Sequence, residues 1–426
     1  MATDTAGTTG TTGTTGAAGA AGATKVVVTG LGATTPLGGD VPSTWAGLLA
    51  GDSGISAIEE DWAAGLPVRI AGRLRVEPSE VIDRVQARRL DRCEQIALIA
   101  AREAWADAGR PDVEPERLAV VIGTGTGGAL SMLGQDDVLE ASGVRKVSPH
   151  TVPMLMANGP AAWVSIELGA KGGAHTPVSA CASGAEAIAM GLDLIRLGRA
   201  DVVVAGGAEA CIHPLPLAGF AQAKAHSTRN DAPQQASRPF DTHRDGFVIG
   251  EGAALVVLER ADFAAARAAR VHAVLAGAGV TSDAHHITSA HPEGQVRAMR
   301  LALASAGLGP LDVQHVHAHA TSTPKGDLTE AESIAEAIGL HPAVTATKSM
   351  TGHLFGAAGA LGAVSVILSL RDRVIPATRN LDDLDPQVKL DVVAGRPRRG
   401  TLGAALTNSF GFGGHNASLV FTAERA

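Results

Sequence analysis

Runs of apolar, β-branched residues alternate along the chain with segments of helical periodicity. The segment KVVVTGLG (25–32) places three valines in succession, which is typical of a strand covered on both faces. Helical periodicity follows at 84–109 and again at 183–200. Further strand patterns occupy 118–128, 176–180 and 200–210. This alternation predicts an α/β fold with a largely parallel sheet.

A second series of the same kind begins near residue 270. Its strand patterns lie at 270–280, 313–322, 342–347 and 401–409, and its helical patterns at 294–307 and 328–339. Two similar series in one chain predict a duplicated unit. We therefore expect an N-terminal half at 25–268 and a C-terminal half at 269–426.

Two segments stand apart from these series. Residues 1–24 are Thr/Gly/Ala low complexity without an apolar run or a basic start, which predicts a disordered tail rather than a secretory signal. The apolar run at 355–370 is interrupted by glycine and is slightly short for a membrane span. We expect this run to form a buried core helix.

Composition and charge narrow the class of function. The 426 residues suffice for a large core, and a net charge of −8 gives no indication of nucleic-acid or membrane binding. The three cysteines form no CxxC pair, which argues against a disulfide framework or a zinc site. Such a set fits the reducing cytoplasm.

One cysteine, Cys181, stands where a strand pattern changes into a helical one. PVSA precedes it, and CASGAEAIAMGLDLI continues with helical spacing. A helix N-terminus favours negative charge, so it lowers the pKa of a thiol from about 8.5, and its free N–H groups can hold an oxyanion. The segment alone fits a nucleophile and a small buried core cysteine equally well.

Histidines gather in the second series. His315, His317 and His319 alternate in HVHAHATSTPKGD (315–327), so on a strand they share one face. No carboxylate or thiolate partner is obvious nearby, which makes a metal site the minor alternative. His319 adjoins the polar loop at the strand end and is expected to reach a site. His315 and His317 are expected to pack or to face solvent.

Two other loops combine glycine with polar residues. ATKSMTGHLFGAAGA (346–360) has the pattern of a strand, a turn and an apolar helix, with Lys348 and His353 bracketing the turn. These two side chains either point into a shared cleft or belong to a solvated loop. NSFGFGGHN (408–416) lacks a P-loop lysine, so a mobile loop with a backbone N–H donor and an aromatic gate is a better interpretation than phosphate binding.

Taken together, these segments resemble the β-ketoacyl-acyl carrier protein synthases of the elongating type II, particularly actinobacterial members. Four motifs carry the resemblance in the family's order: SACASGAEA, HATSTPKGD, KSMTGHLFGAAGA and NSFGFGGHN. The likeness extends from Lys25 to about Thr422. It implies the thiolase-like fold, with two similar halves in a five-layered αβαβα sandwich, and a homodimer.

The resemblance also implies an acyltransferase of fatty acid elongation without a cofactor or a metal. An acyl chain would be held on Cys181 and attacked by the carbanion that decarboxylation of malonyl-acyl carrier protein produces. His319 and His353 would stabilise the enolate, and the N–H groups of Cys181 and Phe412 would form an oxyanion hole. Phe412 would also act as a gate. Lys348, Glu330 and Asp327 would support the histidines. Glu330 would either pair with Lys348 or order the loop that carries His319. Thr321 and Thr323 would bind the pantetheine.

Basic positions match the family's docking sites for the acidic carrier protein. They are Arg84, Arg88 and Arg89 on a predicted helix, Arg145 and Lys146 at a loop, and Lys224 as a third element. A solvated charged face is the alternative for each of them. Rim charges of this kind would mainly steer the encounter.

Departures from the pattern and rival functions remain. His317 stands where the family usually has Asn and is a neighbour that could perturb His319, and His415 replaces a common threonine.

The main alternative function is that of a type II polyketide ketosynthase. A silent chain-length partner would lack Cys181, and a cysteine hydrolase would need GxCxG where residues 179–183 read SACAS. The acyl chain length is not predicted.

Overall fold

The computed structural model describes residues 24–424, so the prediction of a disordered tail at 1–24 falls outside the described residues apart from Thr24. One series of hydrogen-bonded strands crosses the molecule in the order β12-β10-β9-β14-β15-β8-β1-β7-β6-β4-β5. The strands are β1 (Val26–Thr34), β4 (Leu118–Gly123), β5 (Ala174–His175), β6 (Val202–Glu209), β7 (Gly252–Arg260), β8 (Ala273–Ser282), β9 (His315–His317), β10 (Ala343–Thr345), β12 (Asp391–Val392), β14 (Ala404–Gly411) and β15 (His415–Thr422).

This series divides into two sheets where β1 meets β8. The β1–β7 pairing extends from Val26 to Thr34, whereas β1 pairs with β8 only over Val26–Val28. Within each sheet the outer pairs, such as β4–β6 and β9–β10, are parallel, and the inner pairs β6–β7, β1–β7, β14–β15 and β8–β15 are antiparallel. The expectation of a largely parallel sheet was therefore wrong for the inner strands. A strand buried on both faces has the same apolar run in either direction, so the pattern did not encode its orientation.

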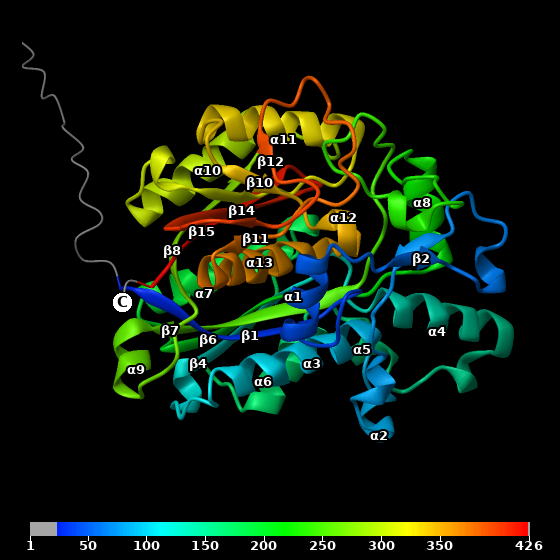
Figure 1. The fold of residues 1–426 in the computed structure, drawn as a ribbon. Coiled ribbons are helices and arrows are strands. Elements are labelled where there is room, and N and C mark those ends of the chain that lie inside the picture. The colour runs from blue at the N-terminus through cyan, green and yellow to red at the C-terminus, as the bar shows by residue number, and fades with distance from the viewer. Residues whose placement is uncertain (1–23, 425–426) are drawn as a thin grey trace, which may run out of the picture.

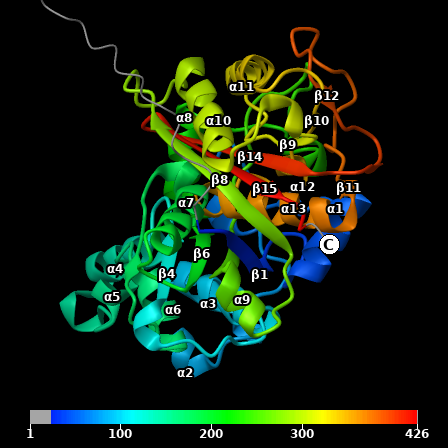
Figure 2. The same cartoon turned by 90° about the vertical axis from the view of Figure 1, so that its left-hand side faces the viewer.

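Helices form three layers around and between the two sheets (Figure 1). The outer layer under the first sheet includes α3 (Arg92–Asp107) and α6 (Gly159–Leu168), and the layer over the second includes α10 (Pro292–Ala306) and α11 (Pro324–Ala337). Between the sheets lie α7 (Ser183–Arg196) and α13 (Ala358–Asp372), as Figure 2 shows from the side. The predicted αβαβα sandwich is confirmed.

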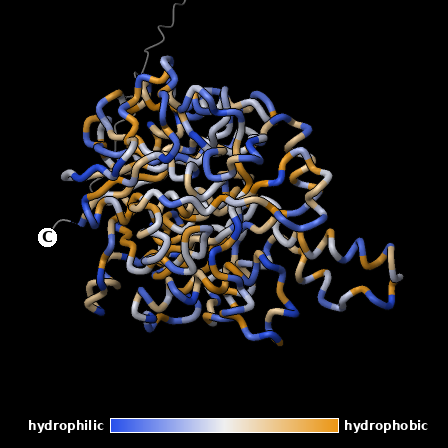
Figure 3. The backbone as a smooth tube through the Cα atoms, turned by 45° about the vertical axis from the view of Figure 1, so that its right-hand side comes forward, coloured by the Kyte–Doolittle hydropathy of each residue, from blue (hydrophilic) through white to orange (hydrophobic). Residues whose placement is uncertain are grey.

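The central helices hold the core between the sheets. Ala358–Leu370 of α13 is buried throughout, and the apolar helical stretch Phe355–Asp372, long enough to span a membrane, is 89% buried inside the molecule. Apolar segments run through the interior in Figure 3, while hydrophilic ones dominate its outline. The expectation of a buried core helix is confirmed, since burial between two sheets supplies the apolar surroundings that this composition requires.

Two predicted boundaries were wrong. The segment 84–109 is not one helix but α2 (Arg84–Ala87) and α3, because Asp91 forms a capping box with Glu94 that starts a new helix. The strand expected at 176–180 is absent: β5 ends at His175, and residues 176–179, which include Pro177, belong to no helix or strand. The remaining elements are α1 (Val41–Ala50), α4 (Ala129–Ser142), α5 (Thr151–Leu155), α8 (Pro214–Gln222), α9 (Ala261–Ala266), α12 (Lys348–Thr351), β2 (Ile55–Ala57), β3 (Ile70–Gly72), β11 (Val374–Ile375) and β13 (Arg398–Arg399).

Candidate active site

Cys181 occupies a tight turn directly before the central helix α7. It lies in a single 3₁₀ turn, η5 (Ala180–Ala182), and Ala180 has the left-handed φ of 51° that a non-glycine residue seldom adopts. Ser183 holds this turn, because its Oγ accepts from the Ser179 N–H at 2.9 Å and donates to the Ala180 carbonyl at 2.7 Å. The Cys181 carbonyl accepts a hydrogen bond from Ser409 Oγ of the other half at 2.7 Å.

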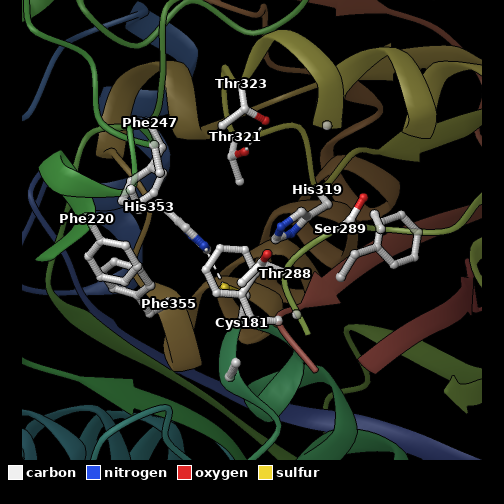
Figure 4. Close-up of a pocket in the computed structure, with 18 of the residues that line it drawn as sticks. Cys181, Phe220, Phe247, Thr288, Ser289, His319, Thr321, Thr323, His353 and Phe355 are labelled. Carbon is white, nitrogen blue, oxygen red and sulfur yellow. Dashed lines mark hydrogen bonds between the residues drawn. The ribbon is translucent and has the colours of Figure 1, made fainter. Parts of the chain in front are cut away.

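His353 reaches Cys181 from the C-terminal half. Its N–H donates to the Val248 carbonyl at 2.7 Å and its carbonyl accepts from the Gly250 N–H at 2.9 Å, so the N-terminal half fixes its backbone. Its Nε2 then lies 3.0 Å from Cys181 Sγ, the contact dashed in Figure 4. The short helix α12 and Gly352, with φ of 71°, turn the chain toward this position.

His319 completes the cluster from the end of β9. Its N–H and that of Ala320 donate to the Glu330 carboxylate at 2.8 and 2.6 Å, and its carbonyl accepts from the Lys348 ammonium. The His319 and His353 rings face each other edge-on with centroids 5.4 Å apart. One ligand atom from each of Cys181, His319 and His353 lies within 4.8 Å of the others. The structure thus brings together the three residues that the sequence placed in separate motifs.

The charges at this cluster differ from the sequence expectation. Burial raises the pKa of the Cys181 thiol to about 12, while Lys348 and the N–H groups of Phe412 and Cys181 lower it. The N–H groups at the start of the helix lower this pKa, in the direction that the sequence predicts, but desolvation is the larger effect and places the pKa above its ordinary value. Burial, followed by the Lys348 charge, places the pKa values of His319 and His353 well below 6.5. A neutral thiol thus faces neutral imidazoles.

Lys348 supplies positive charge beside this neutral cluster. Its side chain is 5% exposed, and burial lowers its pKa to about 8, against the opposing effects of Glu330, Cys181 and Asp327. At neutral pH the ammonium form therefore predominates. A positive charge near Cys181 stabilises the thiolate that attacks a thioester.

The backbone N–H groups of Cys181 and Phe412 both lower the pKa of the Cys181 thiol, which is the effect of donors close to the sulfur. Phe412 can approach because it follows Gly411, where a Cβ would overlap the Ser179 carbonyl oxygen. A thioester oxygen held at this position would face both donors, as an oxyanion hole requires. The Phe412 side chain is 43% exposed.

The cluster opens into a cavity of about 590 Å³. Five of the eight phenylalanines of the chain line it: Phe220, Phe247, Phe355, Phe410 and Phe412. Phe220, Phe247 and Phe355 lie on the His353 side, while Thr321 and Thr323, with hydroxyls 3.2 Å apart, lie on another wall (Figure 4). The sequence analysis missed Phe220, Phe247 and Phe355, the loop at 286–290 and Glu209. The scarcity of aromatic residues in the chain was the signal that could have pointed to the phenylalanines.

Glu330 and Asp327 order the loop that carries His319. Burial raises the pKa of Glu330 to about 7, and its oxygens accept from the His319 and Ala320 N–H groups and from Asn408. Two roles were expected for Glu330. In the structure it orders the His319 loop, and within residues 24–424 it forms no ion pair with Lys348, whose ammonium donates to the His319 carbonyl. Asp327, whose pKa burial raises to about 6, accepts from the Phe240 and Thr323 N–H groups.

His317 is buried beside the site and does not enter it. Its Nε2 lies 2.8 Å from Thr347 Oγ1 and its Nδ1 lies 3.3 Å from Thr407 Oγ1. His315 is also buried, with its Nδ1 3.0 Å from the Ala343 carbonyl. Both side chains therefore pack in the interior and do not face solvent, which was one of the two alternatives expected for them. His317 is one of the groups that lower the pKa of His319.

The six basic positions expected to dock a carrier protein are all exposed and take no part in an ion pair within the described chain. Arg84 begins α2, with Arg88 and Arg89 just after it, Arg145 and Lys146 lie in the turn after α4, and Lys224 follows α8 and lines the cavity. The helices α2, α4 and α8 all lie toward the right of Figure 1. Their spread is compatible with one extended surface.

Comparison with known proteins identifies the family. The family model described as "Beta-ketoacyl synthase, N-terminal domain" matches residues 23–264, and "Beta-ketoacyl synthase, C-terminal domain" matches residues 272–382. The chain belongs to the β-ketoacyl synthase family. Family membership confirms the resemblance that the four motifs carried.

Relatives within this family are similar over nearly the whole chain. The 3-oxoacyl-[acyl-carrier-protein] synthase 2 of Mycobacterium bovis is 47% identical over 402 residues, which cover 93% of this chain and 96% of the relative. The solved structure titled "The ishigamide ketosynthase/chain length factor" has a TM-score of 0.89 at 33% identity, covering 95% of this chain and all of that one. A type II PKS ketosynthase in complex with its acyl-carrier protein, bound to the hexaketide, has a TM-score of 0.88 at 30% identity over the same shares. The expected likeness to actinobacterial members and the thiolase-like fold of the β-ketoacyl synthases are both confirmed.

Proposed function

We propose that the chain is a 3-oxoacyl-acyl carrier protein synthase of the elongating type II. It condenses malonyl-acyl carrier protein with a Cys181-bound acyl chain and yields β-ketoacyl-acyl carrier protein. The observation that carries this is the 3.0 Å contact of Cys181 Sγ with His353 Nε2, beside His319 and two N–H donors. The mycobacterial relative, named for this activity, supports fatty acid elongation.

The first half-reaction loads the acyl chain. The Cys181 thiol gives its proton to solvent, the thiolate sulfur attacks the carrier thioester, and the N–H groups of Cys181 and Phe412 hold the tetrahedral oxygen. The carrier thiolate that leaves takes a proton from solvent. Lys348 favours this path because its charge lowers the pKa of Cys181.

The second half-reaction extends the chain. The bond between the malonyl α-carbon and its carboxylate breaks, and the electron pair enters an enolate whose oxygen accepts hydrogen bonds from His319 and His353. Neutral imidazoles suit this role, since they donate without a competing charge, and both pKa values lie well below 6.5. The carboxylate leaves as carbon dioxide. The α-carbon then attacks the acyl-Cys181 carbonyl, and the Cys181 sulfur leaves as the thiolate, which takes a proton from solvent.

The substrate arm and the carrier protein would use the outer parts of the cavity. We assign Thr321 and Thr323 to the pantetheine, because their hydroxyls line the cavity on a wall away from Phe220. Arg84, Arg88, Arg89, Arg145, Lys146 and Lys224 would attract the acidic carrier protein, and Phe412 would gate the cavity. The structure neighbour solved with its acyl-carrier protein supports such docking. No cofactor beyond the substrates' phosphopantetheine and no metal enters the mechanism.

A homodimer in the cytoplasm is part of the proposal. The short strand β5 ends its sheet and leaves one edge open to pairing, and α4 to α6 expose several large apolar side chains. These are Met132, Leu139, Val144, Val152, Met156 and Ile166. We also retain the division into halves at 25–268 and 269–426, which the family-model boundaries support.

A type II polyketide ketosynthase is the second candidate, because one similar solved structure is titled as a ketosynthase/chain length factor and another as type II PKS. Their identities of 33% and 30% are lower than the 47% to the mycobacterial synthase. A silent partner or a hydrolase has less support, since Cys181 is present and faces two imidazoles.

The decisive assay incubates the protein with malonyl-acyl carrier protein and acyl-carrier-protein primers and identifies the products. We expect β-ketoacyl-acyl carrier protein. Free acid would indicate a hydrolase, the absence of product would indicate a silent partner, and repeated extension without reduction would indicate a polyketide enzyme.

In His353→Ala, the decarboxylation rate should fall by about 10²–10³-fold while Cys181 is still acylated. An unacylated variant would contradict the assigned roles.

A further inference from the structure

Glu209 is a buried carboxylate for which the proposed mechanism has no use. It ends β6, lines the cavity and has a side chain with 0% exposure. Within residues 24–424 its partners are neutral hydrogen-bond donors rather than a cation. A buried carboxylate without a cation is costly, so its presence indicates a purpose beyond packing.

The donors around Glu209 come from both halves of the molecule. The loop after β4 supplies the Gly125 N–H at 2.7 Å and Thr126 through its hydroxyl at 2.6 Å and its N–H at 3.2 Å. The second half supplies the Gly356 N–H at 3.0 Å. A backbone N–H can only donate, so this set of donors is matched to the ionised carboxylate.

Gly356 belongs to the segment that carries His353. It lies in the 3₁₀ turn η8 (Phe355–Ala357), three residues after His353, and the Phe355 and His353 rings have centroids 4.7 Å apart. A Cβ on Gly207 of β6 would overlap the Gly356 carbonyl oxygen, so η8 rests directly on the strand. Glu209 is the side chain that bonds η8 to this strand and to the cavity wall at once.

We propose that Glu209 is a positioning residue that holds the His353 segment against the cavity wall and serves decarboxylation rather than acylation. The inference rests on the proposed function and names a residue that this function did not include. Misplacing a catalytic group by about 1 Å costs about 10²-fold in rate, which gives the expected size of the effect.

The charge of Glu209 provides a second, independent readout. Glu209 raises the pKa of Cys181, and Lys348 lowers it. The other titratable groups that face Cys181 are His319 and His353, whose pKa values lie far below 6.5, and Cys211, whose pKa burial raises well above 9.0. Removal of the Glu209 charge should therefore make the Cys181 thiol more acidic.

The test compares Glu209→Gln and Glu209→Asp with Glu103→Gln. Glu103 is a matched control, because it also accepts two backbone N–H bonds, from Ala33 and Val41, but lies outside the cavity. Three quantities are measured on the full chain: acyl transfer to Cys181, decarboxylation of malonyl-acyl carrier protein, and the pH dependence of Cys181 alkylation by iodoacetamide, mapped by mass spectrometry.

In Glu209→Gln we expect decarboxylation to fall about 10²-fold, acyl transfer to persist, and the alkylation midpoint to move to lower pH. Glu209→Asp keeps the charge but shortens the reach, so decarboxylation should fall with an unmoved midpoint. A decarboxylation rate equal to that of the wild type in either variant would overturn the proposal. An equal loss of acyl transfer and decarboxylation in Glu209→Gln, with an unmoved alkylation midpoint, would also overturn it. If Glu209→Gln does not fold, Glu209→Asp decides alone. A wild-type protein without condensation would instead refute the proposed function.

Discussion

The acidity of Cys181 depends on a contest between desolvation and nearby charge. Burial is the largest influence and raises its pKa to about 12, Glu209 adds to that effect, and Lys348 opposes it. His353, neutral and 3.0 Å away, can donate a hydrogen bond from Nε2 to the sulfur. At the scale of single residues the resting site is therefore a neutral thiol beside a neutral imidazole, and the Lys348 charge favours the thiolate.

Lys348→Met tests this balance of charges. Loss of the ammonium removes the group that lowers the Cys181 pKa, so the alkylation midpoint should move to higher pH and acylation at pH 7 should slow. Lys171→Met is the matched control, because Lys171 is exposed and pairs with Glu116 on the surface at 3.8 Å. Alkylation profiles of the two variants provide the measurement, and an unmoved profile in Lys348→Met would contradict the assignment.

Cys181→Ser tests the nucleophile itself. A serine hydroxyl has a far higher pKa than a thiol and is not activated in this pocket, so chain transfer should fall to background. Cys93 is fully buried, and Cys93→Ala should retain transfer. Radiolabelled acyl transfer with peptide mapping measures both, and transfer that persists in Cys181→Ser would remove the basis of the mechanism.

At the scale of elements, the site depends on close approach between a turn and a hairpin. The β14–β15 hairpin brings Phe412 to Cys181, and Ser409 of the same hairpin bonds the Cys181 carbonyl. Gly411 is the point of contact with Ser179. The proposed oxyanion hole therefore combines two elements that are remote in sequence.

Gly411→Ala should separate these two elements. Its Cβ would overlap the Ser179 carbonyl, so we expect about 1–3 kcal/mol of destabilisation and a slower acyl transfer as the Phe412 N–H moves away. Gly400→Ala is the control, because no heavy atom lies within 4 Å of a Cβ there. Thermal unfolding and acylation rates measured together test this, and a fully active Gly411→Ala would place the second donor elsewhere.

At the scale of the whole molecule, positive charge is unevenly distributed over the surface. The chain has a net charge of −8, yet α2, the turn after α4 and the end of α8 expose six basic residues outside any ion pair in the described part of the chain. Acidic and basic surfaces attract over about 8 Å at physiological salt, so such a surface would accelerate encounter with an acidic partner.

Reversal of these charges tests the docking surface. Arg88→Glu with Arg89→Glu should raise KM for malonyl-acyl carrier protein several-fold and leave KM for malonyl-pantetheine unchanged, because the small substrate does not need the surface. High salt should shrink the difference. Arg399→Glu, on β13, is the control. An equal change for both substrates would mean that the arginines support the fold instead.

How far the sequence predicts this protein depends on the kind of feature. Continuous apolar runs predicted β1, β4 and β6, because a doubly covered strand must be apolar on both faces. They did not predict strand direction, nor the break between α2 and α3. The four motifs named Cys181, His319, His353 and Phe412, which the fold brings to one cavity. Phe220, Phe247 and Glu209 carried no motif and were missed.

By itself, the sequence determined the alternation of strands and helices, the duplicated architecture, the family and three residues, Cys181, His319 and His353, that lie together in the structure. These follow from local pattern and side-chain chemistry. Only the tertiary structure decided the distances within the cluster, the elevated pKa of the Cys181 thiol and the junction of both halves at Glu209. Each of these depends on which groups remote in sequence become neighbours and on how much water they exclude.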